Sequence, residues 1–172
     1  ALATGGFTLE VSKNYKFIKP LIIYNYFSKN LNESIINNKN SIILNEESEL
    51  TLINYIDDDS KNNFMSNTID NVMIKKNACL KNIFINNSRS SGYFYKYIKS
   101  TLNKGSSCDN YLLSAGLKFN KLDIEIDHNE ENSRSGIFSA LNLLGLEHQE
   151  IKTRINHNAP NCQSYQKIKN VL

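Results

Sequence analysis

The sequence is poor in the residues that build tight hairpins, disulfide frameworks and zinc modules. Of its 172 residues, two are proline, seven are glycine, three are cysteine and none is tryptophan. So few prolines and glycines argue against a meander of tight hairpins. Cys79, Cys108 and Cys162 lie far apart and form no C-x-x-C pair, and pairing two of them would leave one over. A reducing compartment therefore fits the chain best.

Long apolar runs and clusters of one charge are also missing. Apolar runs such as 21–23 fall far short of the roughly 18 residues that cross a bilayer, and no signal-peptide pattern opens the chain. The 20 basic and 17 acidic residues give a net charge of +3, spread evenly, whereas phosphate neutralisation needs denser basic patches. We therefore expect neither a membrane nor a nucleic acid as partner. The expected location is the cytoplasm, or alternatively the stroma of a plastid-type organelle.

What the sequence does have is an apolar period of two, which is typical of strands with one buried face. Leu122, Ile124 and Ile126, for example, alternate with acidic residues, and helical periodicity is nearly absent. The chain is thus predicted to be all-β. The Asn-rich stretch 37–40 is interpreted as a surface loop, because a bias toward AT-rich codons explains the abundant asparagine. Strands are predicted at 7–11, 20–26, 41–44, 49–56, 67–75, 79–86, 93–99, 109–119, 122–126, 137–144 and 147–157.

A weak internal repeat favours a solenoid over a sandwich or a barrel. The segments 48–52 and 78–82 lie thirty residues apart, and each puts a small residue after a polar turn and a leucine two positions later. In a solenoid each coil packs only on its neighbours, so turns of unequal length are tolerated. We predict a parallel β-helix formed by a single domain over 1–172. Because the sequence stops within an apparent strand, the domain is expected to be cut short at its C-terminal end.

The three histidines are the natural candidates for metal ligands or a general base. His148 and His157 are nine residues apart, whereas neighbours on one strand face are two apart. His157 is in phase with Ile155 and is expected to point inward, where a hydrogen-bonded structural role is the commoner outcome. Cys162 follows His157 by five residues, and the two are kept as candidate ligands of a soft metal. With no third ligand nearby, a small buried thiol is the commoner interpretation of Cys162.

Other polar clusters have ordinary structural explanations. The acidic runs 46–47, 57–59 and 130–131 lack the ligand spacing of a calcium loop and are interpreted as solvated turns. The tyrosine-rich segment 93–97 would suit sugar or base stacking, but strands favour aromatic residues for packing alone. No P-loop, dinucleotide fingerprint or nucleophile elbow occurs. From the residues themselves, no enzyme is predicted.

Taken together, three stretches resemble the SufB/SufD family of iron-sulfur cluster assembly proteins. The opening at 1–21 and the strand, acidic turn and return strand at 41–53 resemble the N-terminal pattern of the family. Residues 145–167 resemble its core segment. The matching positions there are Thr153, His157, Ser164 and Lys167. The turn at 158–162, followed by Ser164 and Gln166, resembles the SufD branch more than the SufB branch.

The resemblance implies a right-handed parallel β-helix that pairs with a SufB-like paralogue as a heterodimer and works with a SufC-like ATPase. Such a subunit would be a non-catalytic scaffold of a SufBCD-type complex. The iron-sulfur cluster would belong to the full complex, and no cofactor would be bound by this segment alone. The later Cys-Ser-His-Gly-Ala-Thr segment of the family has no counterpart here, and neither do its SufC-docking helices. No cluster ligand is therefore carried over, and Cys162 and His157 stay metal candidates only.

Two alternatives from other classes stay open. One is a carbohydrate- or surface-binding β-solenoid or β-sandwich that uses the face of Tyr93 to Tyr97. The other is a metal-dependent hydrolase that uses His148 and His157 together.

Overall fold

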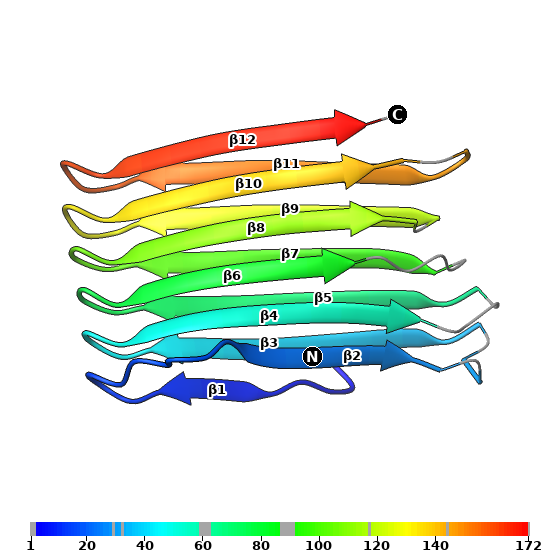
Figure 1. The fold of residues 1–172 in the computed structure, drawn as a ribbon, viewed down its shortest axis with the longest axis horizontal. Helices are drawn as coiled ribbons and strands as arrows, with labels where there is room; N and C mark the ends of the chain where they lie inside the picture. The colour runs from blue at the N-terminus through cyan, green and yellow to red at the C-terminus, as the bar shows by residue number, and fades with distance from the viewer. Residues whose placement is uncertain are drawn as a thin grey trace.

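The fold is a stack of β-coils. The computed structural model describes residues 3–28, 30–31, 33–58, 63–86, 92–116, 118–143 and 145–171. Throughout these residues the regular elements are all strands, and they form a β-solenoid of about five turns (Figure 1). The all-β prediction is confirmed. Ala1, Leu2, Asp59, Leu117 and Leu144, which entered the sequence-based predictions, lie outside the described residues.

Two six-stranded parallel sheets face each other across the core. Sheet A holds the odd-numbered strands β1 (Thr8–Val11), β3 (Ile35–Leu44), β5 (Met65–Ile74), β7 (Tyr93–Leu102), β9 (Phe119–His128) and β11 (His148–His157). Sheet B holds the even-numbered strands β2 (Leu21–Phe27), β4 (Glu49–Asp58), β6 (Cys79–Asn86), β8 (Ser107–Ala115), β10 (Arg134–Asn142) and β12 (Gln163–Val171). In Figure 1 sheet B is nearer and its strands run to the right, while sheet A runs back to the left as the chain rises. The coil is therefore right-handed, as the resemblance implied.

The register confirms the thirty-residue repeat. Glu49 pairs with Cys79 and Leu50 pairs with Leu80, so Ser48 and Ala78 occupy the same place in successive coils. Alternate residues are buried along the middle strands of the stack, as in β6, β7, β8 and β9. The largest fully buried side chains are Ile42, Leu44, Leu52, Ile74, Leu80, Ile98, Leu102, Leu112, Leu122, Ile124 and Ile126. The period of two in the sequence therefore identified the core correctly.

In two places the structure differs from the predictions by more than a few residues at a strand end. The prediction of a surface loop at 37–40 is wrong, because these residues belong to β3, which runs from Ile35 to Leu44. The asparagines there form ladders between coils: Asn67 donates to Asn37 over 2.9 Å, and Asn40 donates to Asp70 over 2.8 Å. An amide ladder satisfies both partners without apolar packing, so an apolar pattern cannot reveal it. The predicted strand 109–119 is also divided, because the chain turns between β8 and β9 at Gly116, whose φ is 81°.

One edge of the stack is built from short turns with a common geometry. Each turn from sheet A to sheet B contains one residue in the left-handed region, where asparagine and glycine are best tolerated. These residues are Asn14, Glu47, Asn77, Gly105, Asn132 and Asn161. In the turns after β3 and beyond, a small side chain follows this residue. The hydroxyls of Ser48 and Ser106, for example, donate to the carbonyls three residues earlier, over 2.6 and 2.7 Å. This turn edge positions the candidate site.

Candidate functional site at the turn edge

A buried histidine sits at the turn edge of the coil formed by β9 and β10. His128 ends β9 and is fully buried. Its Nδ1 lies 2.7 Å from the Ser133 Oγ and its Nε2 lies 2.9 Å from the Ser135 Oγ. Both ring nitrogens are therefore paired with hydroxyls, which can donate or accept. Burial is the main cause that lowers the pKa of His128, with a smaller contribution from His157.

The same arrangement recurs one coil later and is more exposed. Positions 128, 133 and 135 are followed in the stack by His157, Cys162 and Ser164. His157 stacks on His128 with ring centroids 4.8 Å apart, and its Nε2 lies 3.1 Å from the Ser164 Oγ. The prediction that His157 points inward is confirmed. Its side chain is exposed because β11 and β12 form the last coil of the stack.

Cys162 takes the place that Ser48, Ser106 and Ser133 hold in earlier coils. Its Sγ lies 3.3 Å from the Ser133 Oγ, and the thiol donates to the Glu130 carbonyl over 3.4 Å. Cys162 is half-buried rather than buried. The structure thus brings Cys162 and His157 to one edge of one coil, where a thiol and an imidazole are donors that soft metals accept. Across the described ranges, no three His, Cys, Asp or Glu residues form a metal-binding group.

We expect the buried His128 to make stability depend on pH. Its pKa is lower in the folded protein than the ordinary 6.5, so the unfolded chain binds more protons below pH 6.5. The stability that neutral His128 provides is complete above pH 6.5 and falls as the pH drops through the lower folded value. Urea unfolding between pH 7.5 and pH 5 should show this loss, and His128→Gln should flatten it. An equal pH dependence in the variant would show that other groups cause it.

The remaining family-motif positions are divided between the two faces of the last coil. The Thr153 hydroxyl donates to the Gln166 Oε1 over 2.9 Å, which joins β11 to β12. Thr153 thus lies on the inward side with His157 and Ser164, whereas Lys167 pairs with Phe138 in the outward-facing column of sheet B. Sequence reasoning missed the role of His128. Two signals in the sequence could have revealed it. His128 is in phase with Leu122 and Ile126, and the histidine and serine at 128 and 135 recur with the same spacing at 157 and 164.

The hypothesis that His148 and His157 form a joint metal site is wrong. The two histidines are the first and last residues of β11, about 30 Å apart at the usual rise of a strand. They also point to opposite faces: the His148 ring stacks outside on Phe119 with centroids 5.0 Å apart, whereas His157 lies over His128. The hydrolase alternative therefore has no common site for its two ligands.

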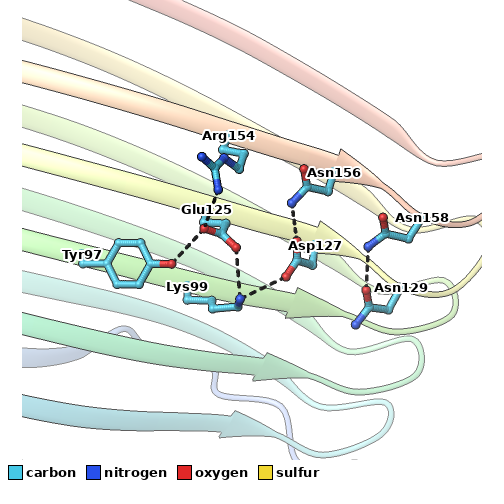
Figure 2. A network of polar contacts seen from close by, with 8 residues as sticks. All are labelled: Tyr97, Lys99, Glu125, Asp127, Asn129, Arg154, Asn156 and Asn158. Carbon is cyan, nitrogen blue, oxygen red and sulfur yellow. Dashed lines mark hydrogen bonds and ion pairs between the residues drawn. The ribbon is translucent and has the colours of Figure 1, made fainter.

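The outer face of sheet A carries a charged network (Figure 2). The Glu125 carboxylate accepts hydrogen bonds from the Tyr97 hydroxyl over 2.9 Å and from the Lys99 ammonium over 3.0 Å, and Arg154 approaches to 3.8 Å. The bond from Lys99 is the main cause that lowers the pKa of Glu125. Lys99 also lies 3.5 Å from Asp127, so one ammonium links two carboxylates. The network ties β7, β9 and β11 together across three coils.

The tyrosines of β7 lie on one face of the strand, between the buried residues Phe94, Lys96 and Ile98. Tyr95 and Tyr97 point outward, and their hydroxyls donate to Asp123 and Glu125 over 3.0 and 2.9 Å. Tyr93 stacks on Phe119 with centroids 6.0 Å apart. These contacts give the tyrosines a packing role within sheet A. Glycan binding through this face stays a prediction.

Inside the solenoid lies a polar cluster that the sequence did not suggest. The Lys96 ammonium lies 2.6 Å from the Asp70 carboxylate, with only 11% and 3% of the two side chains exposed. Asn40 donates to the other Asp70 oxygen over 2.8 Å, and the Lys96 ammonium lies 5.0 Å above the Phe84 ring. A cavity of about 200 Å³ adjoins Lys96 and also touches Asn54. The cluster is a buried ion pair with its polar groups satisfied.

The two other cysteines occupy unlike environments. Cys108 is fully buried, and burial raises the pKa of its thiol to about 12, so it stays protonated. Cys79 is exposed on the outer face of sheet B. Because thiolates react and thiols do not, Cys108 is chemically inert in the folded chain.

Comparison with models of known protein families gives a match over most of the chain. A family model described as "SUF system FeS cluster assembly, SufBD core domain" matches residues 26–172. No curated protein matches the chain. In the part of the chain that the structure describes, no helix has the length and apolar character needed to cross a bilayer.

Proposed function

The chain belongs to the SufBD core-domain family of the SUF iron-sulfur cluster assembly system, and on that premise we propose that it is a non-catalytic scaffold subunit of a SufBCD-type complex. The observation that carries the proposal is the extent of the family match. It begins in β2 and covers β3 to β12, so the whole solenoid beyond its first coil corresponds to the family core.

A scaffold role agrees with how the chain is built. Each coil packs its inward aliphatic residues on the coils before and after it, and polar ladders such as Asn54 to Asn82, over 2.9 Å, fix the register. A stack of this kind holds surface groups at fixed spacings, which is what a site shared between subunits requires. We further propose that the chain corresponds to SufD, with a SufB-like paralogue and a SufC-like ATPase as partners. The resemblance of 158–166 to the SufD branch supports this.

The proposal is tested by association under anaerobic, reducing conditions. We expect the tagged chain, co-expressed with SufB-like and SufC-like proteins of its own genome, to retain both through gel filtration. The recovered complex should hold iron and sulfide after anaerobic incubation with both, because cluster assembly is the task of the family. A chain that elutes without either partner would contradict the scaffold assignment.

The same complex tests whether Cys162 contacts the cluster. Cys162→Ser changes a half-buried thiol beside His157, and Cys79→Ser changes an exposed thiol elsewhere as a matched control. If Cys162 is a ligand, bound iron falls in Cys162→Ser and not in Cys79→Ser, while both variants still bind their partners. Equal iron content in the two variants would remove Cys162 from the candidate ligands and leave the scaffold proposal intact.

A further inference from the structure

A column of inward polar residues leads from Lys96 to the N-terminal end of the solenoid, where β1 and β2 form the first coil (Figure 1). Lys96 pairs with Thr68, Thr68 with Asn38, and Asn38 with Gly5. A neighbouring inward column ends at the side chain of Leu9, which packs against the core. Because Gly5 has no side chain, the polar column is not covered in the same way. The interior is therefore left unfilled at this point of the first coil.

The cavity of about 200 Å³ beside Lys96 lies at this end of the stack. Its lining begins in the first coil, with Gly6 on one side and Ile23 of β2 on the other, and reaches inward to Asn120 of β9. A water molecule occupies about 30 Å³ in the liquid, so the cavity has room for about six or seven waters. That volume also suits one small organic molecule. We call this space the N-terminal cavity.

Several polar side chains in the lining of the N-terminal cavity lack a hydrogen-bond partner. Among the described residues, no partner is found for the side chains of Asn25, Asn38, Ser66 and Thr68. Ser66 is only 3% exposed, so bulk water cannot serve its hydroxyl. Asn54 donates to Asn82 over 2.9 Å, but its own carbonyl oxygen accepts no bond from the described residues. Buried polar groups are nearly always paired with protein, ordered water or a ligand, so these groups point to an occupant of the cavity.

The charges at the N-terminal cavity are already balanced. Lys96 is the charged residue of the lining, and its ammonium lies 2.6 Å from the Asp70 carboxylate. Asn40 donates to the same carboxylate over 2.8 Å, so neither member of the ion pair needs a further counter-ion. A charged occupant would be buried without a partner of opposite charge, which is strongly unfavourable. The occupant is therefore uncharged.

Opposite walls of the N-terminal cavity have different chemistry. On the side of sheet A the lining is mostly polar and includes Ser66, Thr68 and Lys96. On the side of sheet B it is mostly apolar and includes Ile23 and Phe84. A fitting molecule has hydroxyl groups on one side, because hydroxyls both donate and accept hydrogen bonds as the amides and hydroxyls of the lining do. It has C–H groups on the other side, where they contact the apolar wall.

We propose that the N-terminal cavity binds a small uncharged polyol, of the size of one sugar ring. Its hydroxyl groups bond to Ser66, Thr68 and the amides of the lining, and its C–H face lies against Phe84. It replaces several confined waters and keeps the hydrogen bonds that they make, which favours binding. The site differs from a glycan platform on the tyrosines of sheet A, because it lies inside the solenoid and holds one ring rather than a chain.

The test is a titration of the isotope-labelled 172-residue chain with D-glucose, followed by NMR. We expect the backbone amide signals of Ser66 and Thr68 to shift and to saturate, with a dissociation constant in the millimolar range or tighter. D-glucuronate has the same ring with a carboxylate and should bind about tenfold more weakly or worse, because its charge has no partner in the cavity. Saturable shifts confined to outward residues of sheet A, such as Tyr97, would place the sugar elsewhere and overturn the proposal.

Variants of the lining test the contacts. Thr68→Val removes one hydroxyl and keeps the shape of the side chain, so it should raise the dissociation constant of glucose about threefold to tenfold, as for one neutral hydrogen bond. Ser66→Ala should have a similar effect and replaces Thr68→Val if that variant does not fold. Thr51→Val is the matched control, because Thr51 lies between the buried Leu50 and Leu52 and faces outward from sheet B.

Three results would overturn the proposal. The first is a wild-type chain that shows no saturable shift with glucose, as expected if water alone fills the cavity. The second is equal affinity for glucose and glucuronate, and the third is equal affinity of the lining variants and Thr51→Val. Because the chain is tested without SUF partners, failure here is distinct from failure of the scaffold proposal.

Discussion

Leu112→Ala is expected to lower the free energy of unfolding by about 2–5 kcal/mol, whereas Leu113→Ala should lower it by less than about 1 kcal/mol. The two leucines are neighbours in β8 and differ only in the face they occupy. Leu112 is fully buried between the sheets, and Leu113 is 46% exposed on the outside. Truncating Leu112 leaves a cavity that the stacked coils on either side cannot close. Urea unfolding at pH 7.5 measures both changes.

This pair of variants checks the register of the solenoid directly. A slip of one residue in β8 would exchange the two faces, because side chains alternate with a period of two. Leu113→Ala would then be the costly change. Equal effects from both variants would also contradict the structure, since they would mean that β8 has no distinct inner face. The slope of the unfolding transition should stay constant if only stability changes.

Lys96→Met is expected to cost about 3–5 kcal/mol, because it leaves the Asp70 carboxylate buried without its cation. Removing one partner of a buried ion pair costs more than the pair itself contributes, since the remaining charge has lost its water as well. Asn40 would still donate one hydrogen bond to Asp70, which is too little to replace an ammonium. Thermal and urea unfolding at neutral pH measure the loss.

Lys99→Met is the matched control for Lys96→Met. Lys99 lies three residues later on β7, pairs with Glu125 and has 42% of its side chain exposed. An exposed pair contributes about 0–1 kcal/mol, so its loss should be small. Adding Asp70→Asn to Lys96→Met should recover much of the stability, because the orphaned charge is removed. A Lys96→Met variant as stable as Lys99→Met would show that the Asp70 region is hydrated.

The alternation of apolar and polar residues in the sequence was enough to predict most of the fold. Leu122, Ile124 and Ile126 were placed correctly on an inner face, and the weak repeat at 48–52 and 78–82 gave the coil length. The alternation failed where polar residues point inward. Asn40 and Lys96 both lie inside, and neither is distinguishable from a surface residue by its type. Both contact Asp70, which lies on β5 in the coil between them, so only the three-dimensional stack reveals the contacts.

The candidate site was predicted in part. The inward direction of His157 followed from its phase with Ile155, and the proximity of His157 to Cys162 followed from their spacing. The stacking of His157 on His128 did not follow, although both positions share a histidine, a turn and a serine. An alignment of residues 128–135 with residues 157–164 would have shown the repeat. The predicted joint metal site of His148 and His157 was wrong because the two residues lie at opposite ends of β11.

The two edges of the solenoid differ in how they absorb changes in chain length. From β3 onward, the turns from sheet A to sheet B keep four or five residues (45–48, 75–78, 103–106, 129–133 and 158–162). The opposite connections range from three residues at 116–118 to seven at 28–34. A foreign peptide grafted into the variable edge would lengthen one connection without exchanging inner and outer side chains. That edge is the natural place to attach a reporter, whereas the uniform edge would transmit a graft into the backbone of both neighbouring coils.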